Sequence, residues 1–463
     1  MAQQQTKERY FFIGIGGIGM SALARYFLFH GHAVAGYDRV RSPIAKALEK
    51  EGAEIIYEDD PTKIPQHFQA PNAVHIVYTP AIHLDNKIRQ YYIAQGYQEE
   101  KRSVVLGRIT RSMEALCVAG THGKTTTSTL LAHLLSSSPI GTNAFLGGVS
   151  KNSGSNLYLD EHSPYVVVEA DEYDRSFHQL TPAAAIITST EPDHLDIYHT
   201  AEAYREAFEI FAASTKKGGL LLLNQSVELS HLPEGVDIAR YGSSPECDYY
   251  YSDVEVQDGE LYFTWHAPDA TWQHMHIGTP IEINILNATA AIAMARHLGV
   301  TEGEIRHGLA TFQGSRRRFD RWLNEPEHPV MIDDYAHHPD EIRAALASIR
   351  KLYPEKKIAV VFQPHLYSRT ADFMPQFAAA LSIVDNVILL PIYPAREEPI
   401  PGVTSDALLQ LVTAPKRASV SKEGLLSELE QHHFDVLVMM GAGDIEYELP
   451  KVYHYLQHRP LTN

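Results

Sequence analysis

The chain has 463 residues, of which 44% are apolar and 21% are charged, and its formal net charge is −18 at pH 7. This length exceeds what one hydrophobic core accommodates, so we expect two or three domains. The acidic balance argues against nonspecific binding to nucleic acid or to an anionic membrane, so an anionic substrate must be met by local positive groups.

The chain has only two cysteines, Cys117 and Cys247, which argues against a disulfide framework or a cysteine metal site. No apolar run approaches the roughly 20 residues of a membrane span, and the first residues contain no secretory apolar segment. We therefore expect a cytoplasmic, multidomain enzyme.

The recurring pattern is a short apolar strand, a glycine or polar loop and an amphipathic helix, which is typical of α/β domains. We predict three consecutive domains over residues 1–107, 108–312 and 313–463: a Rossmann-like domain, a central P-loop ATPase-like domain and a second Rossmann-like domain. The predicted strands cover residues 10–13, 33–37, 73–78, 115–118, 165–168, 184–188, 330–332, 358–362, 387–390 and 436–440. The central domain adds a β-rich stretch over 249–277 and a helix over 288–297.

The first glycine loop, Gly14-Ile15-Gly16-Gly17-Ile18-Gly19, fits the G-x-G-x-x-G pattern between a strand and a helix. Asp38 ends the next strand, where a ribose-binding acid belongs. Because the same geometry serves any diphosphate-containing nucleotide, NAD and a purely structural turn stay open as alternatives. We favour a UDP-sugar, bound by Gly16, Gly17, Ile18, Gly19 and Asp38, because a second nucleotide motif follows.

That second motif is Ala119-Gly120-Thr121-His122-Gly123-Lys124-Thr125-Thr126-Thr127, between an apolar run and a helical pattern. Backbone N–H groups and the helix N-terminus can face a phosphate, Lys124 adds a positive charge, and the Thr125 hydroxyl can reach Mg²⁺. We expect ATP to contact residues 120–126: Gly120, Thr121, His122, Gly123, Lys124, Thr125 and Thr126. The alternative is a glycine-rich turn without a nucleotide.

Acidic residues follow the strand at 165–168, in the segment Glu169-Ala170-Asp171-Glu172-Tyr173-Asp174. Carboxylates at the carboxyl end of a strand beside the P-loop strand suit Mg²⁺. The next strand is followed by His194, which could hold a second metal together with Glu169. We predict metal binding by Thr125, Glu169 and His194, against the alternatives of a solvated acidic loop and a structural histidine.

Seven motifs occur in an order that resembles the Mur ligase family, over residues 12–445. Besides the two glycine motifs and the acidic segment, four lie in the third domain. They are Arg-Arg-Phe (317–319), Asp-Asp-Tyr-Ala-His-His-Pro (333–339), Phe-Gln-Pro-His-Leu-Tyr-Ser-Arg-Thr (362–370) and Gly-Ala-Gly-Asp-Ile (441–445).

The resemblance implies ATP- and Mg²⁺-dependent amide formation in peptidoglycan precursor synthesis. The carboxylate of UDP-N-acetylmuramate would be activated as an acyl phosphate, and in the alanine-adding branch L-alanine would displace the phosphate. Two alternatives stay open: a recycling ligase that adds a preformed tripeptide to the same sugar nucleotide, and a nucleotide sensor or scaffold without catalysis. The sequence leaves the choice between a monomer and a homodimer open.

The resemblance also assigns roles to single residues. Lys124, Glu169, His194, Arg318 and Asp334 would be catalytic, and Asn284 and Asn287 would contact the adenine. Arg318 and Asp334, from the third domain, would reach ATP when the domains close, and His337, His365 and Arg369 would line the amino-acid pocket. Without the resemblance, the two asparagines read as helix caps and Arg318 as a surface charge. Ile283 and Leu366 depart from the family pattern, where many relatives carry a histidine and a basic residue.

Overall fold

The computed structural model describes residues 7–70, 73–193, 195–257, 260–395 and 397–459. Two compact units are distinguished within the chain. Unit 1 comprises Met1–Asp253, Phe263–Met275 and Leu286–Phe312, and unit 2 comprises Val254–Tyr262, His276–Ile285 and Gln313–Asn463.

Unit 1 begins with a five-stranded parallel sheet in the order β3-β2-β1-β4-β5. Its strands are β1 (Arg9–Ile13), β2 (Ala33–Tyr37), β3 (Glu54–Ile56), β4 (Val74–Tyr78) and β5 (Glu99–Lys101). The helices are α1 (Ile18–Phe29), α2 (Pro43–Glu51), α3 (Lys87–Ala94) and α4 (Arg102–Ser112), with short 3₁₀ turns η1 (Pro61–Lys63) and η2 (Gln66–Phe68). Along β1, Tyr10 and Phe12 belong to one hydrophobic cluster and Phe11 and Ile13 to another, so both faces of the sheet are buried.

The second sheet, most of whose residues belong to unit 1, has ten strands in the order β15-β14-β13-β12-β11-β10-β6-β9-β7-β8. They are β6 (Glu114–Ala119), β7 (Asn143–Phe145), β8 (Leu157–Tyr158), β9 (Tyr165–Glu169), β10 (Ala184–Ile187), β11 (Leu220–Asn224), β12 (Asp237–Gly242), β13 (Tyr249–Gln257), β14 (Glu260–Ala267) and β15 (Ala270–Ile277). The helices are α5 (Lys124–Ser136), η3 (Tyr173–Gln179), α6 (Leu195–Tyr198), α7 (Ala201–Ala213), α8 (Glu282–His297) and α9 (Glu302–Thr311).

The central strands of this sheet place the predicted phosphate site. β6 pairs in parallel with β9 on one side and with β10 on the other. The carboxyl ends of parallel strands meet at one edge of a sheet, so the segments that follow these three strands lie together there. The P-loop, Glu169 and residues 188–191 are those segments.

Unit 2 contains a six-stranded sheet in the order β16-β17-β21-β18-β19-β20, in which only β16 is antiparallel to its neighbour among the described pairs. Its strands are β16 (Asp320–Leu323), β17 (Val330–Asp334), β18 (Ile358–Phe362), β19 (Asn386–Leu389), β20 (Lys416–Ser419) and β21 (Val436–Met440). The helices are α10 (Pro339–Leu352), α11 (Tyr367–Asp372), α12 (Met374–Leu381), α13 (Ser405–Leu411), α14 (Leu425–Glu430), η4 (Asp444–Glu448) and α15 (Leu449–Gln457).

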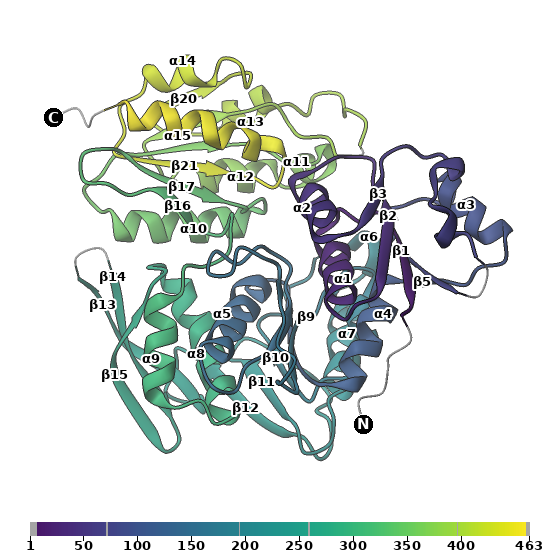
Figure 1. Ribbon diagram of the computed structural model, residues 1–463. Coiled ribbons are helices and arrows are strands. Elements are labelled where there is room, and N and C mark those ends of the chain that lie inside the picture. Colours follow the sequence, from purple (N-terminus) through teal and green to yellow (C-terminus); the bar gives the residue numbers. More distant parts are fainter. Residues whose placement is uncertain (1–6, 71–72, 194, 258–259, 396, 460–463) are drawn as a thin grey trace. The chain divides into compact units, whose positions relative to one another are not determined.

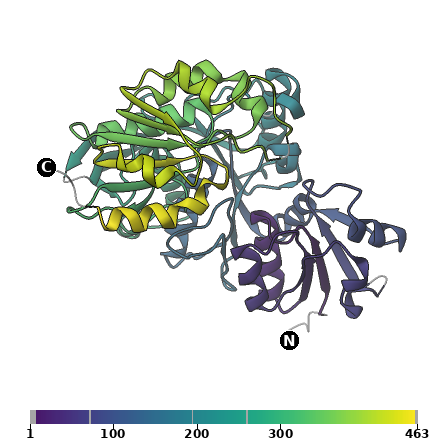
Figure 2. The same ribbon diagram turned by 90° about the horizontal axis from the view of Figure 1, so that it is seen from above.

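Helices cover both faces of this sheet, with α10, α12 and α13 on one face and α14 and α15 on the other (Figure 1). Figure 2 shows the green and the yellow helices of unit 2 on opposite sides of the strands. Successive residues of β18 alternate between the two cores, with Val360 in one and Val361 in the other. This double burial explains why the strands of unit 2 are nearly continuous apolar runs.

The predicted α/β class with three consecutive sheet-bearing regions is confirmed. The domain boundaries remain a proposal, and we propose to move the first from residue 107 to the end of α4, because that helix continues through Ser112. The helix predicted over 288–297 begins earlier, at Glu282. None of the helices in the described ranges is long and apolar enough to cross a membrane.

Candidate functional site

The P-loop connects β6 to α5 and requires glycine at two positions. Gly120 has φ +135°, and a Cβ there would lie 2.0 Å from Oγ1 of Thr188. Gly123 has φ +82°, and a Cβ there would lie 2.7 Å from Oδ1 of Asn287. Both positions therefore require glycine, which lets the loop pass close to Thr188 and Asn287. Asn287, an expected adenine contact, therefore lies against the P-loop.

Lys124, the first residue of α5, bends back over its own loop. Its Nζ donates to the carbonyl oxygen of Gly120 at 2.5 Å and lies 2.7 Å from a carboxylate oxygen of Glu172. The two side chains are 14% and 3% exposed. Burial is the largest cause and lowers the pKa of Lys124, but the carboxylates of Glu172, Glu169 and Asp171 together outweigh burial, so the pKa of the lysine is raised. The lysine is therefore a cation, and a phosphate that binds the loop must compete with Glu172 for it.

Glu169, the last residue of β9, lies beside Thr125 of the P-loop. The Thr125 hydroxyl donates to Oε1 of Glu169 at 3.0 Å, and the backbone N–H of Gly147 donates to Oε2 at 2.9 Å. A hydroxyl and a carboxylate at this separation are hard oxygen ligands that fit Mg²⁺. His194, the third expected metal ligand, lies outside the described residues. Within the described ranges, no cluster of three or more His, Cys, Asp or Glu side chains forms a metal site by itself.

The segment after β10 holds the remaining P-loop side chains. Thr121 donates to the carbonyl oxygen of Glu191 at 2.6 Å and lies 2.9 Å from the hydroxyl of Tyr204. Nε2 of His122 lies 3.3 Å from a carboxylate oxygen of the same Glu191. The Thr121 and His122 side chains bind protein groups, and their backbone N–H groups donate to the carbonyl oxygen and to Oγ of Ser189, at 3.2 and 2.9 Å. A nucleotide that uses these two N–H groups must therefore displace Ser189. Thr126 is partly buried in the first turn of α5.

The first glycine loop is held by the acid predicted to bind ribose. Oδ2 of Asp38 accepts a hydrogen bond from the backbone N–H of Gly16 at 2.8 Å, and Oδ1 accepts one from Val40 at 3.0 Å. Gly17 caps α1, whose first two residues, Ile18 and Gly19, complete the loop. Asp38 therefore lies where the sequence predicts it, at the loop, and also fixes the loop's shape.

In unit 2, Arg318 lies between two residues with left-handed backbone, Arg317 (φ +61°) and Phe319 (φ +46°). The Asp334 carboxylate accepts hydrogen bonds from the backbone N–H groups of Phe319 and Ala336, each at 2.8 Å. The resemblance assigned Asp334 to ATP, but both of its oxygens bind the backbone of their own unit. We therefore interpret Asp334 as the residue that fixes the strained segment carrying Arg318.

The guanidinium groups of the two neighbouring arginines differ in their surroundings. Arg317 lies 3.5 Å from Asp333, which is fully buried, and donates to the carbonyl oxygen of Gly441. Arg318 lies over the ring of Tyr335, 5.1 Å from its centroid, and forms no ion pair with any described residue. The sequence could not separate these two roles, because the residues are adjacent and of one type.

Three residues expected in the amino-acid pocket converge in unit 2. The rings of His337 and His365 have centroids 5.9 Å apart, and Arg369 lies close enough to lower the pKa of both. Burial is the larger cause for each histidine and lowers the pKa of His337 to about 4, against the opposing effect of Glu341. Both imidazoles are therefore neutral at neutral pH, and Arg369 is the cation that suits a substrate carboxylate.

His337 gives the protein a pH dependence that can be tested. Its pKa is about 4 when folded, against about 6.5 when unfolded, so it contributes stability that is complete above about pH 6.5 and is lost toward pH 4. We expect His337→Asn to remove about 2 kcal/mol of the difference in unfolding free energy between about pH 8 and pH 5.

Urea unfolding of the wild type and the variant at both pH values measures this difference. The matched control is His231→Asn, at an exposed position of unit 1, which should leave the wild-type pH dependence intact. An equal loss of unfolding free energy on acidification in the wild type and in His337→Asn would contradict the assignment of this pH dependence to His337.

Asn284 lies one turn before Asn287 in α8, and its amide donates to Oγ1 of Thr279 at 3.1 Å. Both asparagines are inside the helix, so neither is the helix cap that the sequence alone suggested. Ile283, between Glu282 and Asn284, is 47% exposed.

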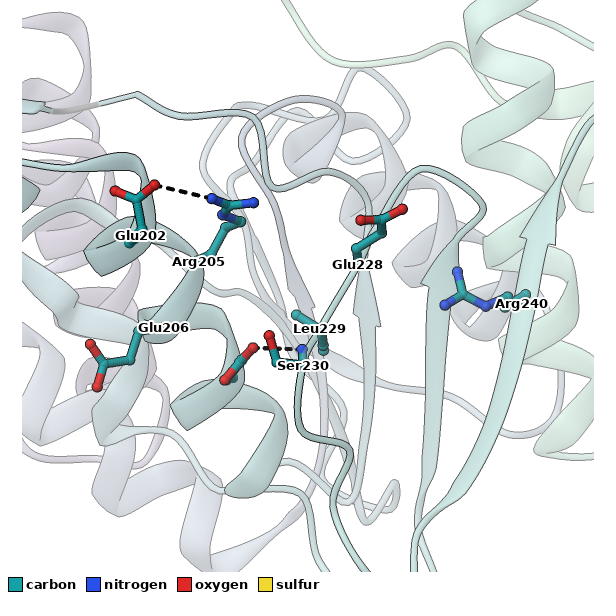
Figure 3. A pocket seen from close by; sticks show the side chains of 8 residues that line it. Glu202, Arg205, Glu206, Glu228, Leu229, Ser230 and Arg240 are labelled. Atoms are coloured by element: carbon teal, nitrogen blue, oxygen red, sulfur yellow. Dashed lines mark hydrogen bonds and ion pairs between the residues drawn. The ribbon is translucent and has the colours of Figure 1, made fainter.

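A pocket of unit 1 lies away from the glycine loops, between α7, the segment that follows β11 and the strand β12, with a volume of about 680 Å³ (Figure 3). Four glutamates and two arginines line it together with Leu229 and Ser230. Its acid-rich lining disfavours a triphosphate, so the P-loop remains the nucleotide site. The lining residues are Glu202, Arg205, Glu206, Glu209, Glu228, Leu229, Ser230 and Arg240.

A P-loop with an acid on the neighbouring strand, preceded by a glycine-loop domain and followed by a domain with a cluster of one arginine and two histidines, is typical of ATP-using α/β enzymes. Three family models match consecutive parts of the chain: "Mur ligase family, catalytic domain" over residues 9–113, "Mur ligase middle domain" over 118–295 and "Mur ligase, glutamate ligase domain" over 317–443. The chain belongs to the Mur ligase family.

The chain is 51% identical over 453 residues to the UDP-N-acetylmuramate–L-alanine ligase of Porphyromonas gingivalis, which covers 97% of this chain and 99% of the relative. It is 48% identical over 437 residues to the enzyme of the same name from Parabacteroides distasonis, covering 94% of each. The crystal structure of the UDP-N-acetylmuramate–alanine ligase of Thermotoga maritima superposes with a TM-score of 0.81 at 28% identity, over 97% of this chain and all of that one.

Proposed function

We propose that the protein joins L-alanine to the carboxylate of UDP-N-acetylmuramate with hydrolysis of ATP to ADP and phosphate, in peptidoglycan precursor synthesis. The observation that carries the proposal is 51% identity, across nearly the full length of both chains, to a ligase named for this reaction. The recycling ligase that adds a preformed tripeptide is disfavoured, because the murein peptide ligase structure from Psychrobacter arcticus is only 22% identical and shows the fold alone.

The reaction has two steps. A carboxylate oxygen of UDP-N-acetylmuramate attacks the γ-phosphorus of ATP, ADP leaves, and an acyl phosphate forms. The deprotonated amine of L-alanine then attacks the acyl carbon, and the tetrahedral intermediate expels inorganic phosphate to leave the amide. Both steps bring anions together, so cations and backbone donors that neutralise the developing charge account for most of the catalysis.

The residues of the P-loop and its neighbours fit the first step. Lys124 would leave Glu172 and bind the β- and γ-phosphates, which the loop N–H groups also contact. Thr125 and Glu169 would hold Mg²⁺, with His194 as a further ligand. A bound Mg²⁺ would help to neutralise the negative charge that develops in the transition state. Asn284 and Asn287 would contact the adenine, and Arg318 would add a second cation at the γ-phosphate.

The arginine–histidine pocket fits the second step. Arg369 would bind the carboxylate of L-alanine, while the neutral rings of His337 and His365 would enclose its small side chain. The first glycine loop and Asp38 would hold the UDP portion of the sugar nucleotide. We propose that the enzyme works in the cytoplasm, as a monomer or a homodimer.

Phosphate release from ATP in the presence of Mg²⁺ and UDP-N-acetylmuramate tests the proposal. L-alanine, glycine, L-serine and the tripeptide L-Ala-γ-D-Glu-diaminopimelate are compared as acceptors. We expect release that depends on both the sugar nucleotide and L-alanine. Release with the tripeptide alone would move the protein to the recycling branch, and no release with any acceptor would overturn the ligase proposal.

A further inference from the structure

The helix that carries Arg369 is short and has no cap of its own. α11 begins at Tyr367, and the residue before it, Leu366, makes no capping hydrogen bond with its side chain. Leu366 also has a left-handed backbone, with φ +71°. A non-glycine residue in this region is strained and persists only where the surrounding contacts hold it. The contacts that hold the start of α11 therefore come from another part of the chain.

The segment that follows β19 supplies one of these contacts. The Glu397 carboxylate accepts hydrogen bonds from the backbone N–H of Ser368 at 3.0 Å and from the Ser368 hydroxyl at 2.5 Å. Burial raises the pKa of Glu397, but the hydrogen bonds from Ser368 and from the backbone of Tyr367 outweigh burial, so the pKa is lowered. Glu397 is therefore an anion at neutral pH, and its hydrogen bonds are charge-assisted. It caps α11 from a position 29 residues further along the chain.

The same segment also contacts the chain before Leu366. The backbone N–H of Tyr393 donates to the carbonyl oxygen of Pro364 at 2.8 Å, and the N–H of Leu366 donates to the carbonyl oxygen of Tyr393 at 2.9 Å. The ring of Tyr393 stacks on the ring of His365, with the centroids 5.6 Å apart. Tyr393 and Glu397 thus hold the chain on both sides of the strained leucine.

We propose that Glu397 is a positioning residue of the ligase, which holds the start of α11 so that Arg369 can bind the carboxylate of the amino-acid substrate. This inference rests on the proposed function, which assigns that carboxylate to Arg369. Arg369 follows Ser368 in the first turn of α11, so a shift of the helix start moves the arginine with it. A guanidinium binds a carboxylate through two parallel hydrogen bonds, so its affinity depends on its direction.

Steady-state phosphate release with each substrate varied in turn tests this role. We expect Glu397→Ala to raise the KM for L-alanine by about 10- to 30-fold, as for loss of a charged hydrogen bond, and to change the KM values for ATP and UDP-N-acetylmuramate by less than about twofold. Glu397→Gln keeps the shape and one acceptor, and Ser368→Ala keeps the backbone donor. Both should raise the KM for L-alanine less than Glu397→Ala does, and both keep the test valid if Glu397→Ala does not fold.

Glu398→Ala is the matched control, because Glu398 is the next residue, is exposed and loses the same atoms. It should leave all three KM values unchanged, and a rise in the KM for L-alanine equal to that of Glu397→Ala would overturn the inference. A lower kcat with a wild-type KM for L-alanine in the Glu397 and Ser368 variants, as a smaller folded fraction produces, would reduce Glu397 to a structural residue and also overturn it. If the wild-type protein releases no phosphate in response to L-alanine, the proposed function itself fails, and the role of Glu397 with it.

Discussion

Replacing Lys124 with alanine is expected to lower kcat for alanine-dependent phosphate release by about 1,000-fold. The lysine is a buried cation that lies on the phosphate cradle, 2.7 Å from its present partner Glu172. A cation in such a water-poor site interacts strongly with charge that develops on the γ-phosphate, and no other lysine lies in the loop. Steady-state phosphate release at saturating substrates measures the effect.

The control for Lys124→Ala must separate catalysis from folding. The single substitution leaves the Glu172 carboxyl, 3% exposed, without its positive partner, which destabilises the protein. The double variant Lys124→Ala/Glu172→Gln removes both charges, so its thermal midpoint should return toward the wild-type value while turnover stays low. Turnover of the double variant close to wild type would remove Lys124 from the catalytic machinery.

Local motifs explain why the two glycine loops were predictable from the sequence. A strand, a glycine turn and a helix start are consecutive in the chain, so the sequence shows the whole phosphate cradle at once. The structure confirms this local arrangement at both loops, with α1 beginning at Ile18 and α5 at Lys124. The strands at 358–362 and 436–440 also have the predicted bounds, because strands buried on both faces are continuous apolar runs.

The start of helix α8 could not be predicted correctly from the local sequence pattern. Its first two turns contain Asn284 and Asn287, residues with low helix propensity that suggest a cap, so the prediction started the helix at residue 288. In the structure the Asn284 amide bonds to Thr279 and Asn287 lies against Gly123. These tertiary contacts outweigh the intrinsic preference of the two residues.

The contacts that define the candidate site most sharply were beyond sequence reasoning. Glu172 pairs with Lys124 from 48 positions away, and Arg102 lies on Gly19 from a different strand–helix unit. The four closely spaced acids of the segment 169–174 predicted a functional role for that segment. The sequence could not show which of these carboxylates pairs with Lys124. Arg102 gave no signal, because a single arginine at a helix start is common on protein surfaces.

Replacing Arg318 with alanine is expected to lower kcat by about 1,000-fold while the KM for ATP changes by less than about fivefold. Its guanidinium lies over the Tyr335 ring and near enough to Asp334 to lower the pKa of that carboxyl, but it forms no ion pair with a described residue, so it can pair with a ligand. The P-loop belongs to unit 1 and Arg318 to unit 2, so nucleotide binding by the loop survives the substitution. Kinetics at varied ATP concentration separate the two parameters.

Arg317→Ala is the matched control for Arg318→Ala, since the two arginines are adjacent and the same atoms are removed. Burial raises the pKa of Asp333 to about 7, and Arg317 is the cation that opposes this shift. Removing Arg317 leaves that buried carboxyl without its partner, so we expect a loss of about 3 kcal/mol in unfolding free energy. Arg318 likewise opposes the raised pKa of the buried Asp334, but Asp334 keeps two backbone hydrogen bonds when Arg318 is removed, so Arg318→Ala should cost less stability than Arg317→Ala. Equal losses of kcat and of ATP affinity in Arg318→Ala would instead assign this residue to ground-state binding of the nucleotide.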